Sequence, residues 1–176
     1  MCQRRANRYE FGRPSANLRP RSGQQDVSAE PIVRIVELER PVEEVWDLWA
    51  DPARVAEWLV PRLRVDLRAG GSFEPVWEGD DAGTRPAGGS RILSLEEEYQ
   101  VRFEWRGPPQ FAELLNRDRP ATTVSARFQP LGPGRTRLRL EHTGWGDGEA
   151  WAAARSWHDE MWGTALERLR QLSPKR

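Results

Sequence analysis

The chain has 176 residues, and its 27 Lys and Arg residues balance its 27 Asp and Glu residues, so the formal net charge at pH 7 is zero. This length suits one domain with a real hydrophobic core, and the charge balance excludes the strongly basic signature of a polyanion-binding protein. A single cysteine, Cys2, excludes an internal disulfide and a cysteine-based zinc cluster, and no apolar run approaches membrane-spanning length.

Residues 1–30 differ in composition from the rest of the chain. They hold six arginines but only three acidic residues, and no apolar stretch follows the arginines as it would in a secretory signal. This composition predicts a disordered basic tail that tolerates deletion. The alternatives are a basic arm that contacts nucleic acid or an anionic surface, and a transit-type segment.

The ordered part of the sequence begins with one strand and two short helices. A run rich in β-branched residues over 31–39 predicts the strand. Pro41 suits the first position of a helix, and apolar residues then recur at helical spacing through Trp49. Asp51 and Pro52 form an N-cap and N1 pair that predicts the start of the second short helix.

Six further strands are expected. Apolar and polar residues alternate over 63–67 and 73–77, and the paired glycines Gly70 and Gly71 between them predict a hairpin turn, because glycine accepts positive φ. The remaining strands are expected at 90–95, 99–106, 122–128 and 136–142. Polar residues 78–89 predict a loop, and the proline-bounded segment 107–120 predicts an excursion with one helical turn.

A long helix is expected to close the chain. Asp147 is its predicted N-cap, and it should run to about Leu172 with one broad apolar face that includes Trp162 and Leu169. An antiparallel sheet with helices gathered on one face is an α+β layer arrangement. The concave side of such a sheet is the expected seat of the long helix.

Several short motifs occur in a consistent order. They are Pro41 to Trp49 (PVEEVWDLW), Asp51-Pro52, Trp58, Pro61, Asp66 to Phe73 (DLRAGGSF), Gly89 to Leu95, Phe103-Glu104-Trp105, Arg135 to Leu138 with His142-Thr143-Gly144, and Trp162 to Leu169. Together they resemble START-like proteins of the Hsp90-ATPase-activator-homologue type, a branch of the SRPBCC superfamily. The resemblance covers about residues 31–172.

This resemblance implies the helix-grip (START-like/Bet v1-like) fold, in one domain over 31–173. The superfamily includes lipid carriers, hormone receptors and cyclases, so the fold alone does not define the function. Two departures stand out: Met161 replaces a glycine that the family often has before the tryptophan, and the long segment 107–120 suits a lid. Nothing resembles the separate N-terminal domain of eukaryotic activators, so chaperone stimulation is not carried over.

Strand parity and helix periodicity predict a cavity between the sheet and the closing helix. The residues expected to line it are Trp77, Phe103, Trp105, Leu140, His142, His158, Met161 and Trp162. The two histidines are interpreted either as hydrogen-bonded core residues or as polar anchors for a ligand in an apolar pocket. No metal site is expected, because Glu141 points away from His142 by strand alternation.

Three classes of function follow. The first is a small cytoplasmic binding protein for an apolar or aromatic small molecule, without a cofactor, acting as a monomer or homodimer. The second is an enzyme of cyclase or hydrolase type that uses His142 or His158; no catalytic residue is assigned, and a non-enzyme is the preferred interpretation. The third is a protein–protein adaptor or cochaperone-like module. Membrane partners are not expected, and nucleic acid is expected only through the arginine-rich tail.

Overall fold

The structure, a computed structural model, describes residues 29–60, 62–77, 90–117 and 122–172. The elements are β1 (Ile32–Leu38), α1 (Val42–Ala50), α2 (Pro52–Trp58), β2 (Leu63–Val65), β3 (Phe73–Pro75), β4 (Ile92–Glu96), β5 (Gln100–Trp105), a 3-10 turn η1 (Pro109–Phe111), α3 (Ala112–Leu115), β6 (Thr122–Gly132), β7 (Arg135–Thr143) and α4 (Glu149–Gln171). The predicted loop at 78–89 lies outside the described residues, as does the predicted basic tail apart from Ala29 and Glu30.

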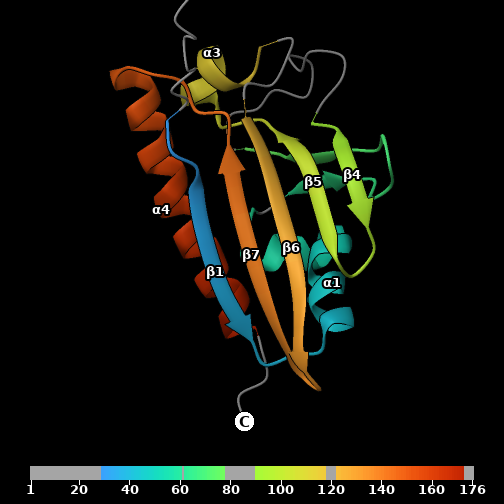
Figure 1. The fold of residues 1–176 in the computed structure, drawn as a ribbon. Coiled ribbons are helices and arrows are strands. Elements are labelled where there is room, and N and C mark those ends of the chain that lie inside the picture. Colours follow the sequence, from blue (N-terminus) through green and yellow to red (C-terminus); the bar gives the residue numbers. More distant parts are fainter. Residues whose placement is uncertain (1–28, 61, 78–89, 118–121, 173–176) are drawn as a thin grey trace, which may run out of the picture.

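Five strands form one curved antiparallel sheet in the order β1-β7-β6-β5-β4 (Figure 1). Its register aligns one row of buried side chains across four strands, since Ile32 pairs with His142, His142 with Val124, and Val124 with Phe103. Alternate residues of β6 and β7 are buried, as the period-two pattern of the sequence predicts. The predicted α+β class is confirmed.

Helices α1 and α4 lie on the same side of this sheet, and α3 lies near one end of its strands (Figure 1). Helix α4 runs alongside β1, where the Arg34 Nε donates to Asp159 Oδ1 at 2.9 Å. The side chains of Trp162 and Leu169 are fully buried, so the predicted grip of the sheet on the closing helix is confirmed. None of the described helices is long and apolar enough to cross a membrane.

Three details differ from the predictions. Gly148, not Asp147, is the N-cap of α4, and its φ of 98° is a conformation that glycine adopts without strain. Pro41 is the N-cap of α1 and not its first residue, whereas Asp51 caps α2 as predicted by accepting from the Ala53 N–H at 2.8 Å. The hairpin of β2 and β3 forms a separate two-stranded sheet.

An aromatic cluster joins α1 and α2 to one end of the sheet. Trp49 lies at its centre, with ring centroids 4.8 Å from Trp58, 5.8 Å from Phe128 and 6.2 Å from Phe73. The indole N–H of Trp58 donates to the backbone oxygen of Leu48 at 2.8 Å, so its polar group is satisfied while its ring is buried. The predicted core role of the Trp49 ring is confirmed.

The turn between β2 and β3 needs its two glycines for different reasons. Gly70 has a φ of 75°, but a Cβ there would meet open space. Gly71 has no positive φ, but a Cβ there would lie 2.0 Å from the backbone oxygen of Asp66. The close approach of two backbone segments, rather than a left-handed conformation, therefore requires the second glycine.

These two glycines give a matched pair of substitutions. Gly70→Ala should lower the free energy of unfolding by about 1 kcal/mol, the strain of placing alanine in the left-handed region. Gly71→Ala should lower it by about 3 kcal/mol, because the backbone oxygen that blocks the new methyl group has nowhere to move. Urea denaturation of both variants measures the difference; equal losses would contradict the steric role of Gly71.

Candidate functional site

A second aromatic cluster lies between the sheet and α4. We call the buried part the inner cluster, and it consists of Phe103, Trp105, His142, His158 and Trp162. Strand β5 supplies the first two, β7 supplies His142, and α4 supplies His158 and Trp162 four residues later, on the same helix face. All five side chains are inaccessible to solvent.

The rings of the inner cluster are in mutual contact. Trp105 is the common neighbour, with ring centroids 4.9 Å from Trp162, 5.8 Å from His142 and 6.1 Å from His158. The two imidazole centroids are 5.6 Å apart. The structure thus brings together the two histidines that the sequence analysis expected to face each other between the sheet and the closing helix.

Hydrogen bonds to the Nδ1 atoms define the protonation of both histidines. The indole N–H of Trp162, which can only donate, lies 3.1 Å from His142 Nδ1, so this nitrogen accepts and the proton of the neutral ring is on Nε2. His158 Nδ1 lies 2.7 Å from the backbone oxygen of Ala154, which can only accept, so its proton is on Nδ1. The two neutral imidazoles are therefore opposite tautomers.

Three polar atoms of this cluster are buried without a hydrogen-bond partner. They are His142 Nε2, His158 Nε2 and Trp105 Nε1. The tautomers make His142 Nε2–H a donor and His158 Nε2 an acceptor, and the indole of Trp105 is a donor. The hydroxyl of Thr122, which pairs with Trp105 across β5 and β6, is also buried and unpartnered. Buried polar groups without partners are costly, so their concentration in one place marks a binding-site candidate.

Burial keeps both imidazoles uncharged. Desolvation lowers the pKa of His142 well below 6.5, and the nearby His158 lowers it further. Desolvation also lowers the pKa of His158 to about 4, although the hydrogen bond to the backbone of Ala154 opposes this shift. At neutral pH the site therefore offers polar contacts but no charge.

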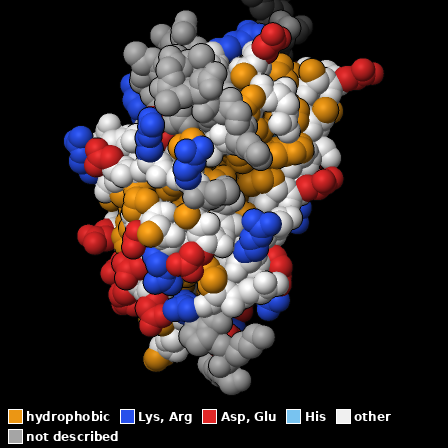
Figure 2. All heavy atoms as spheres, turned by 180° about the vertical axis from the view of Figure 1, so that it is seen from behind, with side chains coloured by type: hydrophobic (Ala, Val, Ile, Leu, Met, Phe, Trp, Pro, Cys, Tyr) orange, Lys and Arg blue, Asp and Glu red, His pale blue; other side chains and the backbone are white. Residues whose placement is uncertain are grey.

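A partly exposed aromatic layer covers the inner cluster. It consists of Trp77, Phe111 and Trp157, which we call the outer layer. The ring centroid of Trp157 lies 5.9 Å from Trp77, 5.7 Å from Phe111 and 4.8 Å from the buried His158. On the face opposite to that of Figure 1, hydrophobic side chains gather in continuous areas (Figure 2).

Trp157 was not among the residues expected from the sequence, although a signal was present. Residues 157, 161, 164 and 168 form a stripe at helical spacing, and all four line a groove of about 290 Å³ between α4 and Leu59 at the end of α2. Met161 lies half-buried in this groove, beside the inner cluster rather than within it. Leu140 is buried two residues before His142 on the same face of β7. That the eight predicted residues line one internal cavity stays a prediction.

The segment after β5 closes over His158. A Cβ on Gly107 would lie 2.5 Å from Leu115 Cδ1 and 3.3 Å from His158 Nε2, so the backbone here approaches the unpartnered nitrogen closely. The side-chain amide of Asn116 donates to the Gly107 oxygen at 2.9 Å. The described part of the segment expected as a lid, residues 107–117, contains η1 and α3, and its role as a lid stays a prediction.

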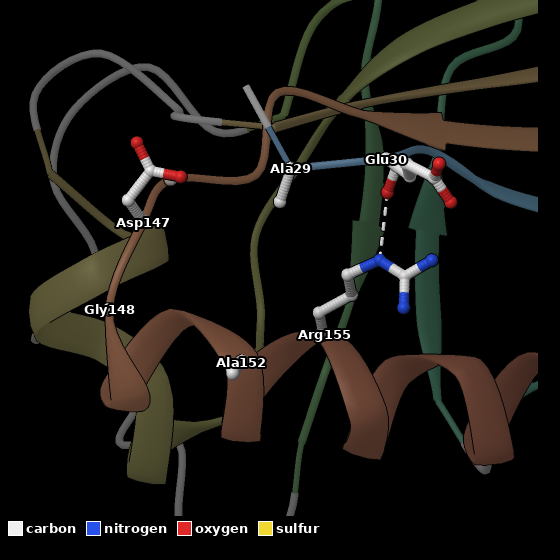
Figure 3. A pocket seen from close by; sticks show the side chains of 7 residues that line it. Ala29, Glu30, Asp147, Gly148, Ala152 and Arg155 are labelled. Carbon is white, nitrogen blue, oxygen red and sulfur yellow. Dashed lines mark hydrogen bonds between the residues drawn. The ribbon is translucent and has the colours of Figure 1, made fainter. Parts of the chain in front are cut away.

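A second hollow, of about 330 Å³, lies where α4 begins (Figure 3). Arg155 reaches into it but donates to the backbone oxygens of Glu30 at 2.8 Å and Pro31 at 3.3 Å, which ties the start of β1 to the helix. This guanidinium has a structural role. Among the described residues, no group of three His, Cys, Asp or Glu side chains has the geometry to hold a metal ion.

Comparisons with known proteins agree with this fold. The model of the family described as "Activator of Hsp90 ATPase homolog 1-like protein" matches residues 39–173. Protein MLL2253 from Mesorhizobium loti is 21% identical, with a TM-score of 0.61 over 81% of this chain and 96% of its own. The Aha1 dimer from Colwellia psychrerythraea is 13% identical, with a TM-score of 0.60 over 81% and 94%.

CalU16 from Micromonospora echinospora is 23% identical, with a TM-score of 0.56 over 82% of this chain and 76% of its own. At these identities the likenesses show a shared fold. No curated protein sequence matches the chain.

The neutral histidines predict a pH dependence of stability. Because both folded-state pKa values are below 6.5, the unfolded chain binds more protons as the pH falls below that value. The free energy of unfolding should be constant above a pH of about 6.5. Below that pH it should fall by up to about 1.4 kcal/mol per pH unit for each histidine. Urea denaturation between pH 7.5 and 4.5 measures this loss.

Carboxylates such as Glu37 and Glu167 have pKa values lowered from 4.5, so they stay ionised over this pH interval. The loss of stability measured above pH 4.5 therefore reports on the histidines. His158→Gln should reduce the slope of the pH profile by about half. A flat profile for the unaltered protein would contradict the burial of neutral imidazoles.

Proposed function

The chain belongs to the Activator of Hsp90 ATPase homolog 1-like protein family, and from the site described above we propose that it binds a small apolar or aromatic molecule between the sheet and α4. The observation that carries this proposal is the set of unpartnered polar atoms within the inner cluster. Ligand sites typically combine many apolar and aromatic walls with a few polar groups that orient the ligand. The inner cluster and the outer layer have this composition.

The outer layer supports a route of entry. Its three side chains are partly exposed, and each contacts a ring of the inner cluster: Trp77 lies 6.0 Å from Trp105, and both Phe111 and Trp157 contact His158. Rotation of partly exposed side chains is fast and needs no change of fold. An apolar molecule in the groove beside Trp157 would therefore reach the histidines by displacing one layer of rings.

The same chemistry disfavours the enzyme hypothesis. A general acid–base residue works best with a pKa near the working pH, and the pKa of His158 is about 4. The lowered pKa of His142 and its acceptor bond from Trp162 likewise suit a fixed neutral ring. The adaptor or cochaperone-like role remains the alternative if no ligand binds, and a homodimer is compatible with either role.

The binding proposal predicts a specific effect of Trp157→Ala. Removing an indole wall of on the order of 60 Å² at about 25 cal/mol per Å² should weaken binding of an uncharged aromatic ligand about tenfold. Titration of the protein with a panel of naphthalene, biphenyl and indole derivatives, followed by tryptophan fluorescence quenching and calorimetry, measures the affinities. Native mass spectrometry of gently purified protein provides an independent search for a carried ligand.

Trp151→Ala is the matched control. Trp151 is a half-buried tryptophan of the same helix whose ring contact is with Trp145, outside the outer layer, so its loss should leave affinity within about twofold. If folded protein binds no member of the panel and carries no ligand, the binding proposal is wrong and the adaptor hypothesis takes its place.

A further inference from the structure

The unpartnered atoms of the inner cluster have a definite donor and acceptor pattern. His142 Nε2–H and Trp105 Nε1–H are donors, and His158 Nε2 is an acceptor. The three rings that carry them contact one another pairwise, with centroids 5.6 to 6.1 Å apart. A group that satisfies all three must accept two hydrogen bonds and donate one.

We propose that the molecule bound by this protein presents a hydroxyl group to the inner cluster, where its oxygen accepts from His142 and Trp105 and its proton is donated to His158 Nε2. This inference rests on the proposed binding function and narrows the ligand class to uncharged phenols and alcohols with an apolar body. A hydroxyl is the common group that has two lone pairs and one donor proton on the same atom.

Other polar groups fit this pattern less well. A carbonyl or ether oxygen satisfies the two donors but leaves His158 Nε2 without a partner. A carboxylate has the same defect and would also be buried beside neutral rings, without a counter-charge, which is strongly unfavourable. An ammonium group cannot accept from His142 or Trp105. The pattern therefore selects by chemical type and not only by size.

The fixed tautomers make this selection rigid. His142 cannot move its proton from Nε2 to Nδ1 without losing the bond from Trp162. His158 cannot move its proton from Nδ1 to Nε2 without losing the bond to Ala154. The lowered pKa values of both rings keep either from gaining a second proton at neutral pH. Each nitrogen consequently keeps one hydrogen-bonding role.

The cover over the site limits the space around the hydroxyl. A Cβ placed on Gly107 would lie only 3.3 Å from His158 Nε2. The Gly107 backbone therefore leaves little room beside this nitrogen. A hydroxyl is among the smallest polar groups, whereas a methoxy group adds a carbon at this position. The limited space and the need for a proton to donate to His158 Nε2 therefore both favour a hydroxyl over a methoxy group.

Three probes of similar shape test the proposal: 2-naphthol, 2-methylnaphthalene and 2-methoxynaphthalene. We expect 2-naphthol to bind at least about tenfold more tightly than either comparator at pH 7.5, where a phenol is uncharged. In a purely apolar site the order would reverse, because the methyl compound is the more hydrophobic of two molecules of nearly equal size. Calorimetric dissociation constants for the unaltered protein decide between these orders.

Two variants locate the effect. His158→Phe keeps an aromatic ring but removes the acceptor, so the preference for 2-naphthol over 2-methylnaphthalene should fall to below about threefold while the methyl compound still binds. Trp58→Phe is the control, because it removes a buried indole N–H that already donates to the Leu48 backbone oxygen at 2.8 Å and belongs to the other aromatic cluster, around Trp49. This control should keep the preference for 2-naphthol.

The outcomes separate the two proposals. Binding of all three probes with equal affinity, or with the methyl compound tightest, would overturn the hydroxyl inference and leave the binding function intact. Absence of binding by all three and by the wider aromatic panel would overturn both. A naphthol preference that survives His158→Phe would also overturn the inference, and the probe series on the unaltered protein remains decisive if this variant does not fold.

Discussion

The hydrogen bond from the Trp162 indole to His142 Nδ1 joins the long helix to β7, the second strand of the sheet. Both partners are fully buried, so neither can bond to water instead. This contact therefore constrains how α4 packs on the sheet. It holds α4 in a register that brings His158 against Trp105 and fixes the tautomer of His142. Loss of this bond would leave a further buried donor and acceptor unsatisfied.

Two aromatic clusters divide the interior between them. The cluster around Trp49 has its Trp58 indole satisfied by backbone and joins α1 and α2 to the sheet. The inner cluster has three unsatisfied ring nitrogens and lies under a glycine-dependent cover. The Trp49 indole nitrogen is also buried without a partner, so the two clusters differ in the number of such atoms and in the presence of imidazoles.

Local chemistry made most of the fold predictable. The alternation of β6 and β7, the Asp51-Pro52 start of α2 and the apolar face of α4 all depend on residues near one another in sequence. The predictions failed where geometry competed with propensity: Gly148 replaced Asp147 as the cap of α4. Trp157 was overlooked because its stripe at helical spacing also contains the polar residues Thr164 and Arg168, so the pattern did not separate packing from exposure.

By itself, the sequence determined the class of fold, the order of its elements and the face on which each candidate residue lies, because these follow from periods of 2 and 3.6 residues. Only the tertiary structure decided which faces meet and at what register. That register places a donor on β7 opposite an acceptor on α4, with the Trp105 indole in contact with both rings. Whether a buried polar atom has a hydrogen-bond partner depends on distances between residues of different elements, and the pattern of the sequence does not give those distances.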